Sequence, residues 1–541
     1  MVSFCKNFKE NVSTFASQFS FYDKLFVVLF LLITFFSFYR LGRASINNDA
    51  QFWYSRTEEF ISEIQDHDWG ETLQNPKPGI TVHWLSGLSL ETFLNLYEWH
   101  YGFRPQIWTY DTFHLVHTAV IAPLILVSLG FILVYYLVVS KLFSKKLAFF
   151  SVLLFGLQPF YIGLSRNFHA DSTVTAFMGI SALLLLLFLS SSEVPKWKWL
   201  IFSGVFAGLA LLSKSSAIFL LPYFVLALFS DFITQRRNFW FYLKAVLIWF
   251  FTCAFTFVAV FPDMWIEPLE NLKIIFINEG LFLARVGRDG ADASSEIFNG
   301  FFDYFEPLYR DLTLVFLVSA FLGIALYIRN FLSDIFTSFD LSSRNIKELL
   351  RSFNKVFSRE KSAILILCYA LFYFVQMSLV AQKMDRYLLP LIPFLAFFGG
   401  YLLVQIKKTF SNKNKKYFLL ASFLLAVSTT AYYFPNYLLY PSIKGKDQFG
   451  CSLCSNVGDY LNSKDNPSDL KIVITSNKVH RLRPFVKGKI YTLNQDLPNG
   501  WTVEYLVAAN HEELPPDYSH CTLETKIRFR SLPYWKIYKC K

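Results

Sequence analysis

The chain has 541 residues, of which 54% are hydrophobic, 19% aromatic and only 17% charged. Soluble domains usually carry about 25% charged residues, so this composition excludes an ordinary soluble globular protein. A net charge of +11 would point to nucleic acid in a soluble protein. Here most of the excess lies in short loops between apolar runs, where it reports membrane orientation.

Apolar runs long enough to cross a bilayer, at about 20 residues each, recur along most of the chain. No small-residue cleavage site follows the first run, so we interpret it as a signal anchor. Residues 50–66 and 78–97 have helical apolar spacing and are predicted to form amphipathic helices at the membrane interface. The long run 199–230 is interrupted by Ser213-Lys214-Ser215-Ser216, and we divide it into two spans. Eleven spans are thereby predicted, at about 25–39, 113–139, 147–164, 173–190, two within 199–230, 243–261, 312–328, 363–381, 388–405 and 417–434.

Loops rich in Lys and Arg alternate along the chain with loops that are poor in them. The loops after the second, fourth, sixth, eighth and tenth spans are rich in Lys and Arg, so we expect them in the cytoplasm. The N-terminus is then cytoplasmic, whereas the loops after the odd-numbered spans and the C-terminal tail are external. An undivided 199–230 would place the basic cluster 407–416 outside, which favours the division.

The tail differs in kind from the rest, and we divide the chain into a transmembrane domain, 1–436, and a soluble extracytoplasmic domain, 437–541. We predict a helix around 457–461 and strands at 471–475, 490–492, 501–508 and 526–529. The tail carries no catalytic pattern, so structural support and acceptor binding both stay open. The predicted fold class is an α-helical polytopic membrane protein with interfacial helices in the first external loop and a small C-terminal extracytoplasmic α/β domain.

Four of the seven cysteines fall in the tail: Cys451, Cys454, Cys521 and Cys540. In an extracytoplasmic compartment they are expected to form two disulfides, in any of three pairings. The Cys-x-x-Cys at 451–454 is also a redox or metal-binding spacing, but no His or Cys partner follows at the distance of a zinc finger. The sequence therefore favours disulfides over a metal site.

Three groups of ionisable residues lie at external ends of predicted spans: Asp49, Asp171 and the pair Lys383 and Arg386. A single loop charge is usually an interfacial anchor. Three groups on one face instead indicate one water-accessible site at the outer membrane surface.

Local patterns surround these residues. Asn48-Asp49 opens the first external loop and is followed by Ala50 rather than a second acid. The same loop continues with Asn75-Pro76-Lys77-Pro78-Gly79-Ile80-Thr81-Val82-His83-Trp84. The second external loop is Ser165-Arg166-Asn167-Phe168-His169-Ala170-Asp171. The tenth span is preceded by Lys383-Met384-Asp385-Arg386-Tyr387-Leu388-Leu389-Pro390.

In this order and on this side of the membrane, the patterns resemble the polytopic C-type glycosyltransferases, in the branch of the protein O-mannosyltransferases and the lipid A aminoarabinose transferase. That family has an Asp-Glu pair or single essential Asp, a Lys-Pro-Pro or His-Pro-Gly-Val-Thr element, a Ser-Arg-x-x-His-x-Asp element and a Lys-x-x-Arg-Tyr-Leu-Leu-Pro element. The resemblance covers about residues 25–435, although the paired-acid form is missing. The sequence lacks the tryptophan-rich signature of oligosaccharyltransferase catalytic subunits, which argues against that branch.

The resemblance implies a multi-pass enzyme of the cell membrane that moves a sugar from a polyprenyl-phosphate donor to a hydroxyl of a glycan, lipid or protein, with inversion. Such chemistry needs a carboxylate base and cations that stabilise the departing phosphate. Asp49 suits the base, and Asp171 is the second catalytic candidate, which with His169 would orient Asp49 or the acceptor. The substrate-binding candidates are Lys77, His83, Arg166, His169, Lys383, Arg386 and Tyr387. Membrane lipids are expected partners and nucleic acid is not.

No cofactor is expected. Because the carboxylates do not cluster as Asp-x-Asp, a metal-independent mechanism is favoured over one that uses a divalent metal.

Each candidate has a plainer interpretation. Lys77 is equally explained as a lysine whose ammonium reaches the interface, and His83 and His169 as structural histidines. Asp385 would then only pair with Arg386. The first functional alternative is a transporter or glycolipid flippase, which would place charges near the bilayer midplane and often shows internal repeats. The others are a non-catalytic anchor for the tail and a ligase that joins a glycan polymer to lipid.

Overall fold

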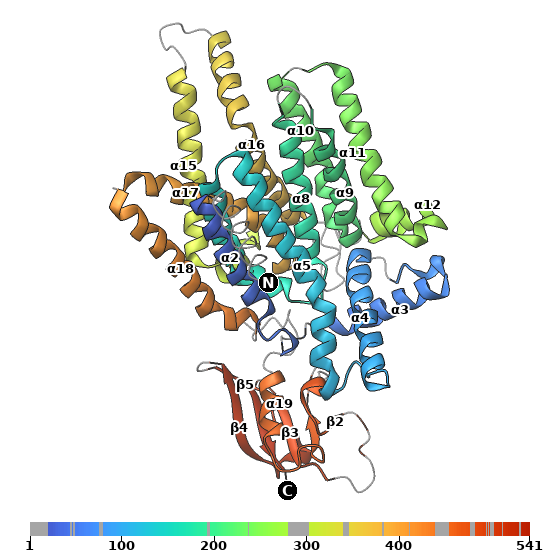
Figure 1. The fold of residues 1–541 in the computed structure, drawn as a ribbon. Helices are drawn as coiled ribbons and strands as arrows, with labels where there is room; N and C mark the ends of the chain where they lie inside the picture. The colour runs from blue at the N-terminus through green and yellow to red at the C-terminus, as the bar shows by residue number, and fades with distance from the viewer. Residues whose placement is uncertain are drawn as a thin grey trace, which may run out of the picture.

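The computed structural model describes most of the chain, and Figure 1 shows its course. The described residues are 20–43, 46, 49–74, 79–191, 195–235, 237–279, 302–338, 346–380, 383–410, 412–438, 454–475, 482–493, 495, 497, 502–510, 512–529 and 532–540.

Helices form the bulk of the molecule. They are α2 (Phe21–Phe38), α3 (Ala50–Asp66), α4 (Ile80–Tyr101), α5 (Tyr110–Leu142), α6 (Lys145–Gly156), α7 (Pro159–Ser165), α8 (Asp171–Leu189), α9 (Trp197–Ser213), α10 (Leu220–Gln235), α11 (Phe239–Val260), α12 (Pro268–Leu272), α14 (Phe305–Asp311), α15 (Leu314–Ser338), α16 (Ile346–Leu379), α17 (Ile392–Thr409), α18 (Asn412–Leu438) and α19 (Cys454–Asn462). Short helical turns link them: η1 (Leu41–Arg43), η2 (Trp69–Glu71), η3 (Ser215–Phe219), η4 (Pro262–Trp265), η5 (Lys273–Glu279), η7 (Asp385–Leu391), η8 (Arg483–Phe485) and η9 (Pro516–Tyr518).

The helical membrane fold predicted from hydropathy is confirmed. Within the described residues, eight helices are long and apolar enough to cross a membrane, or nine if the bent pair α6 and α7 is one span. The shorter apolar helix α9 and the helix α18 lie on the two remaining predicted spans. Helix α8 is buried along its whole length, because α5, α9 and α10 pack around it. The two predicted interfacial segments form α3 and α4, which pack against each other.

Two predicted spans are interrupted. The segment 147–164 was predicted as one span, but α6 and α7 meet at a bend of 67°. Pro159 starts α7 and has no amide N–H to continue the ladder of α6, and a proline also disfavours helical backbone in the residue before it. The run 199–230 is divided as predicted, because Lys214 is extended, at φ −163° and ψ 137°, between α9 and η3.

The tail forms a small mixed sheet at one end of the helices, beneath the start of α5 in Figure 1. Its strands are β1 (Lys471–Ile474), β2 (Lys489–Thr492), β3 (Tyr505–Ala509), β4 (Thr522–Phe529) and β5 (Leu532–Lys539), in the order β2-β1-β3-β5-β4. β1 is parallel to β2 and β3, whereas β5 is antiparallel to β3 and β4. The predicted α/β tail is therefore confirmed, with β5 as an additional strand.

Contacts join the tail to the helical part. Helix α5 packs against η8, and the ring of Phe113 lies 5.9 Å from that of Phe485. Arg43, at the end of η1, pairs with Asp459 of α19 at 3.3 Å. These contacts place the sheet next to the loops that carry the predicted site.

Candidate active site

One guanidinium joins two acids that are far apart in sequence. Arg386 lies in η7, and both of its terminal nitrogens are 3.3 Å from Oδ2 of Asp49. Its Nε is 3.3 Å from Oδ2 of Asp171, the first residue of α8. Because η7 packs against α8 and Asp49 directly precedes α3, the groups from three loops that were predicted to be external meet in one place.

Asp171 is the buried centre of this group, with only 5% of its side chain exposed. Lys214 Nζ lies 2.5 Å from its Oδ1, and His169 Nδ1 lies 2.7 Å from its Oδ2. The ammonium of Lys214 also sits over the ring of Tyr387, 3.9 Å from the centroid. A buried carboxylate needs such partners, since removing it from water is otherwise costly.

His169 lies between the two acids. Its Nδ1 faces Asp171, and its Nε2 is 3.7 Å from Oδ2 of Asp49. A neutral imidazole has one N–H and can donate to only one of them, whereas an imidazolium donates to both. Trp53 covers the ring edge-on at 5.1 Å. Gly79, at φ +87°, permits this packing, because a Cβ there would lie 2.7 Å from the Trp53 ring.

Asp49 is the accessible acid of the group, with 43% of its side chain exposed. An Asp at a helix N-cap usually accepts a hydrogen bond from the backbone of the first turn, but the Asp49 side chain makes no such bond. Its contacts with described residues all use Oδ2. The neighbouring His169 and Arg386 hold the pKa of Asp49 well below its usual range, against the opposing effect of burial. The carboxylate is therefore ionised at neutral pH, with Oδ1 directed to none of the described groups.

Two predicted substrate-binding residues, Arg166 and His83, contact other parts of the protein. Arg166 is buried, and its Nη1 donates to the carbonyls of Phe36 (2.8 Å) and Ser37 (3.2 Å) at the end of α2. His83 is buried in α4 with its Nδ1 2.9 Å from the Thr57 hydroxyl, and burial lowers its pKa to about 3. Its ring is separated from the acids by Trp53, which lies 5.4 Å from it.

The pair Lys383 and Arg386 was predicted to share one helix face, provided that the helix already began there. It begins only at Asp385, and the Lys383 ammonium donates to the carbonyl of Val380 at 3.1 Å. Of these two cations, only Arg386 contacts Asp49 and Asp171.

Asp385, which the plainer interpretation of the sequence paired with Arg386, has a different partner in α14. Asp385 contacts Arg310 of α14, which packs against η7. Arg310 also forms a fork with Asp311, with two contacts of 3.1 Å. Burial raises the pKa of Asp311 to about 7. The Arg310 guanidinium thus contacts two acids and links α14 to η7, the segment that contains Arg386.

Lys77 and Asn48 lie outside the described residues. Lys214 was recognised from the sequence as a break in an apolar run but not as part of the site. A lysine inside such a run is rare unless it has a partner, and this was the available signal. Trp53 carried no signal, because aromatic residues are common near membrane interfaces.

An apolar cavity of about 320 Å³ opens beside the break that holds Lys214. Leu211 and Ile218, on either side of the break, contribute to its wall. The rest of the lining comes from α10, α11, η4, α12 and η5: Leu221, Phe250, Cys253, Ala254, Phe257, Val258, Met264, Leu272 and Phe276. Such a lining suits a hydrocarbon chain.

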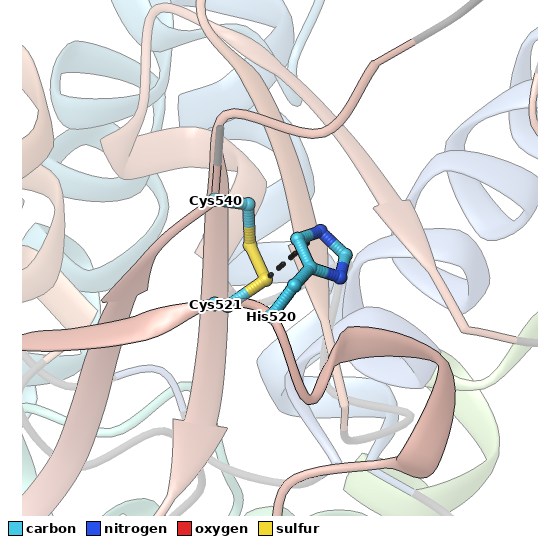
Figure 2. A group of neighbouring side chains, drawn as sticks. All are labelled: His520, Cys521 and Cys540. Atoms are coloured by element: carbon cyan, nitrogen blue, oxygen red, sulfur yellow. Dashed lines mark hydrogen bonds between the residues drawn. A yellow bond between two sulfur atoms is a disulfide. The ribbon is translucent and has the colours of Figure 1, made fainter.

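One group in the described residues has ligand atoms close enough for a metal, namely His520, Cys521 and Cys540, within 4.8 Å of one another. Cys521 and Cys540 form a disulfide, with His520 3.7 Å from the Cys521 sulfur, as Figure 2 shows. The sulfurs are therefore not available as thiolate ligands. Cys454 is also disulfide-bonded, and Cys451 lies outside the described residues. Cys253 and Cys368 are free.

A family model described as dolichyl-phosphate-mannose-protein mannosyltransferase matches residues 108–258, which include His169, Asp171 and Lys214. No curated protein matches the sequence significantly. The crystal structure of ArnT from Cupriavidus metallidurans bound to undecaprenyl phosphate is similar over 95% of this chain and 97% of that chain, with a TM-score of 0.50 and 14% identity. The archaeal oligosaccharyltransferase AglB from Archaeoglobus fulgidus, in complex with an inhibitory peptide and a dolichol-phosphate, gives a TM-score of 0.47 and 11% identity, over 91% of this chain and 70% of that chain.

These comparisons confirm the resemblance drawn from the motifs. The chain is a multi-pass membrane protein with the fold of ArnT. The match to the mannosyltransferase family model covers the segment from α5 to α11.

Proposed function

We propose that this membrane glycosyltransferase of the C-type fold moves a sugar from a polyprenyl-phosphate donor to a hydroxyl of a lipid, glycan or protein acceptor. The reaction takes place at the extracytoplasmic face and inverts the anomeric carbon. One observation carries the proposal: Arg386 joins Asp49 to Asp171, and Asp171 holds Lys214 and His169, so that an accessible carboxylate adjoins fixed cations.

Asp49 is the base in this mechanism. It is the exposed acid of the group, and Oδ1 is directed to none of the described partners. The carboxylate takes the proton of the acceptor hydroxyl as that oxygen attacks the anomeric carbon. The bond from this carbon to the phosphate oxygen breaks, and polyprenyl phosphate leaves with the electron pair.

Arg386 and Lys214 stabilise the departing phosphate. Arg supplies a planar fork and Lys a point charge, and both suit phosphate oxygens. Asp171 is too buried to meet an acceptor and acts as a positioning residue that fixes both cations and His169. Lys77, Lys383 and Tyr387 remain candidates for further donor contacts.

Donor binding also prepares the base. Arg386 contributes to the depressed pKa of Asp49, and a general base works best when its pKa lies near the working pH. A donor phosphate that takes over the Arg386 guanidinium weakens its contact with Asp49. The carboxylate then becomes more basic only when a sugar is present.

The apolar cavity beside Lys214 suits the polyprenyl chain. Its lining is hydrocarbon and aromatic, and the break in the chain that holds Lys214 lies between two of its wall residues. The undecaprenyl phosphate in the ArnT crystal structure supports a donor of this class. The single disulfide identified between described cysteines, Cys521 to Cys540, supports an oxidising, extracytoplasmic location for the tail.

We further propose that no divalent metal takes part. Arg386, Lys214 and His169 already lie beside the two carboxylates, and the positive charges of Arg386 and Lys214 oppose the binding of a metal cation there.

The test is Asp49→Asn, with Glu59→Gln as the control, because Glu59 is an exposed acid on the same helix. The assay offers a panel of radiolabelled polyprenyl-phosphate sugars to the protein in membranes. We expect Asp49→Asn to lower transfer by about 10²–10⁴-fold, the usual cost of losing a general base, and Glu59→Gln to transfer normally. Near wild-type transfer by a well-expressed Asp49→Asn variant would remove Asp49 from the mechanism.

A further inference from the structure

A large cavity that the proposed chemistry leaves unused lies between the helical part and the tail. It has a volume of about 1130 Å³. One wall is the loop before α5 together with Glu58 of α3, and the other is η8 with the edge strand β2. The fold therefore creates this cavity only where the two parts meet.

Its walls carry unequal charges. Arg483, Lys487 and Lys489 line the tail side, and all three side chains are exposed. None of the three forms an ion pair with a described residue. Lys487 instead lies over the ring of Tyr110, 5.3 Å from the centroid. Cations without acidic partners at a cavity wall favour an anionic ligand.

The opposite wall offers groups of another kind. Trp108 and Tyr110 present aromatic rings there, and Glu58 and Asp111 present carboxylates. Tyr491 of β2 adds a third ring from the tail side. Rings with a polar edge suit a ligand that has both apolar and hydroxylated faces, and carboxylates accept hydrogen bonds from hydroxyls. The two acids oppose binding of a bare anion. The combination fits a sugar chain that also carries a negative group.

One wall of the cavity lies near the proposed site. Glu58 follows Asp49 by nine positions on the same helix, which corresponds to about 13 Å along its axis. Trp108 packs edge-on against Tyr54 at 5.0 Å, and Tyr54 packs in the same way against Phe168, next to His169. An oligosaccharide can bridge this span, whereas a monosaccharide cannot.

We propose that this cavity binds the acceptor, and that the acceptor is an anionic carbohydrate carrying phosphate or carboxylate groups. The inference rests on the proposed sugar transfer. The tail thereby acts as the acceptor-binding domain, a role that the sequence left open beside structural support. A peptide acceptor is the rival, since β2 is an edge strand to which a peptide could add.

Binding to the full-length protein in detergent micelles tests this proposal without any donor. The probes are mannopentaose phosphate, the same glycan after dephosphorylation, inorganic phosphate and an acidic peptide, each titrated by calorimetry. We expect mannopentaose phosphate to bind most tightly. Lys487→Ala with Lys489→Ala should weaken it roughly tenfold, as expected for the loss of charge-assisted hydrogen bonds. Trp108→Ala should weaken both glycans.

The charge-matched control is Lys526→Ala with Arg528→Ala on β4, the other edge of the sheet, and it should leave binding unchanged. Thermal unfolding checks that the variants fold. Failure of mannopentaose phosphate to bind, equal binding of the dephosphorylated glycan or of inorganic phosphate, or tighter binding of the peptide would each overturn the proposal. Transfer without glycan binding would overturn only this inference, whereas glycan binding without transfer would overturn only the proposed function.

Discussion

Arg386 lies 3.3 Å from Asp49 on one side and 3.3 Å from Asp171 on the other. The two acids differ in access to water, since the Asp49 side chain is far more exposed than that of Asp171. Arg386 therefore contacts one carboxylate that is accessible enough to act as a base and another that is buried and only positions its partners. A phosphate that binds Arg386 competes with the first acid more easily than with the second.

Replacing Arg386 should mainly impair use of the donor. Arg386→Ala is expected to lower kcat/KM for the donor roughly ten- to hundredfold, since it removes hydrogen bonds to a charged group. Arg386→Lys should restore only part of the activity, because lysine lacks the fork. Lys355→Ala is the control, since Lys355 is an exposed lysine of α16 that the proposed mechanism does not use. Donor kinetics in reconstituted membranes provide the measurement, and equal effects at the two positions would contradict the assignment.

Removing His169 should shift the pH profile. His169, 3.7 Å from the carboxylate, is the largest cause that holds the pKa of Asp49 down, so His169→Ala should raise that pKa toward about 3.9. The base is active when ionised, which is above its pKa. The acid limb of kcat/KM should therefore move to higher pH. His100→Ala, an exposed histidine at the end of α4, should not move it. An unchanged acid limb in His169→Ala would separate His169 from Asp49.

Lys214 and Asp171 should behave as a buried pair. Lys214→Met leaves the acid without its closest partner and is expected to cost about 3–5 kcal/mol of stability. The double variant with Asp171→Leu should recover part of that loss, because no buried charge then stays unpaired. Thermal unfolding in one detergent gives the comparison. Additive losses would show that the two side chains do not interact.

Transfer should survive metal removal. The two carboxylates already have cationic partners, so EDTA should leave the rate within about twofold, a small difference on the free-energy scale. The measurement is transfer in EDTA-treated membranes with and without added Mn²⁺ or Mg²⁺. A loss of activity that either metal restores would contradict the metal-independent mechanism.

The tail should be reachable from outside the cell. After mild reduction of intact cells, an impermeant thiol reagent is expected to label Cys521 and Cys540, which form the disulfide of the sheet domain. A variant without tail cysteines controls for labelling elsewhere. Labelling that requires permeabilisation would place the tail, and the site beside it, in the cytoplasm.

The helical architecture could be predicted because hydropathy acts locally. Each predicted span falls on helical residues, and the lysine that interrupts 199–230 marked the true break at Lys214. Pro159 is equally visible in the sequence, but the apolar run around it concealed the bend between α6 and α7.

Pairings between distant segments could not be predicted in this way. Asp385 adjoins Arg386 in sequence and yet contacts Arg310, because α14 packs against η7. Lys214 reaches Asp171 only once α8 and α9 are packed together. Strand β5 was missed although Tyr534, Lys536 and Tyr538 alternate with Trp535 and Ile537, since Pro533 at its start argues against a strand.

The bend after α6 also sets the depth at which the reaction can occur. Its 12 residues rise about 18 Å, whereas the hydrocarbon core is about 30 Å thick. Helix α7 turns by 67° and adds little height. In the predicted orientation, which places Lys145 at the cytoplasmic surface, the loop that holds His169 and Asp171 is expected to lie within the outer leaflet instead of above it. A lipid-linked sugar can then reach the carboxylates by lateral diffusion, without lifting its phosphate out of the membrane.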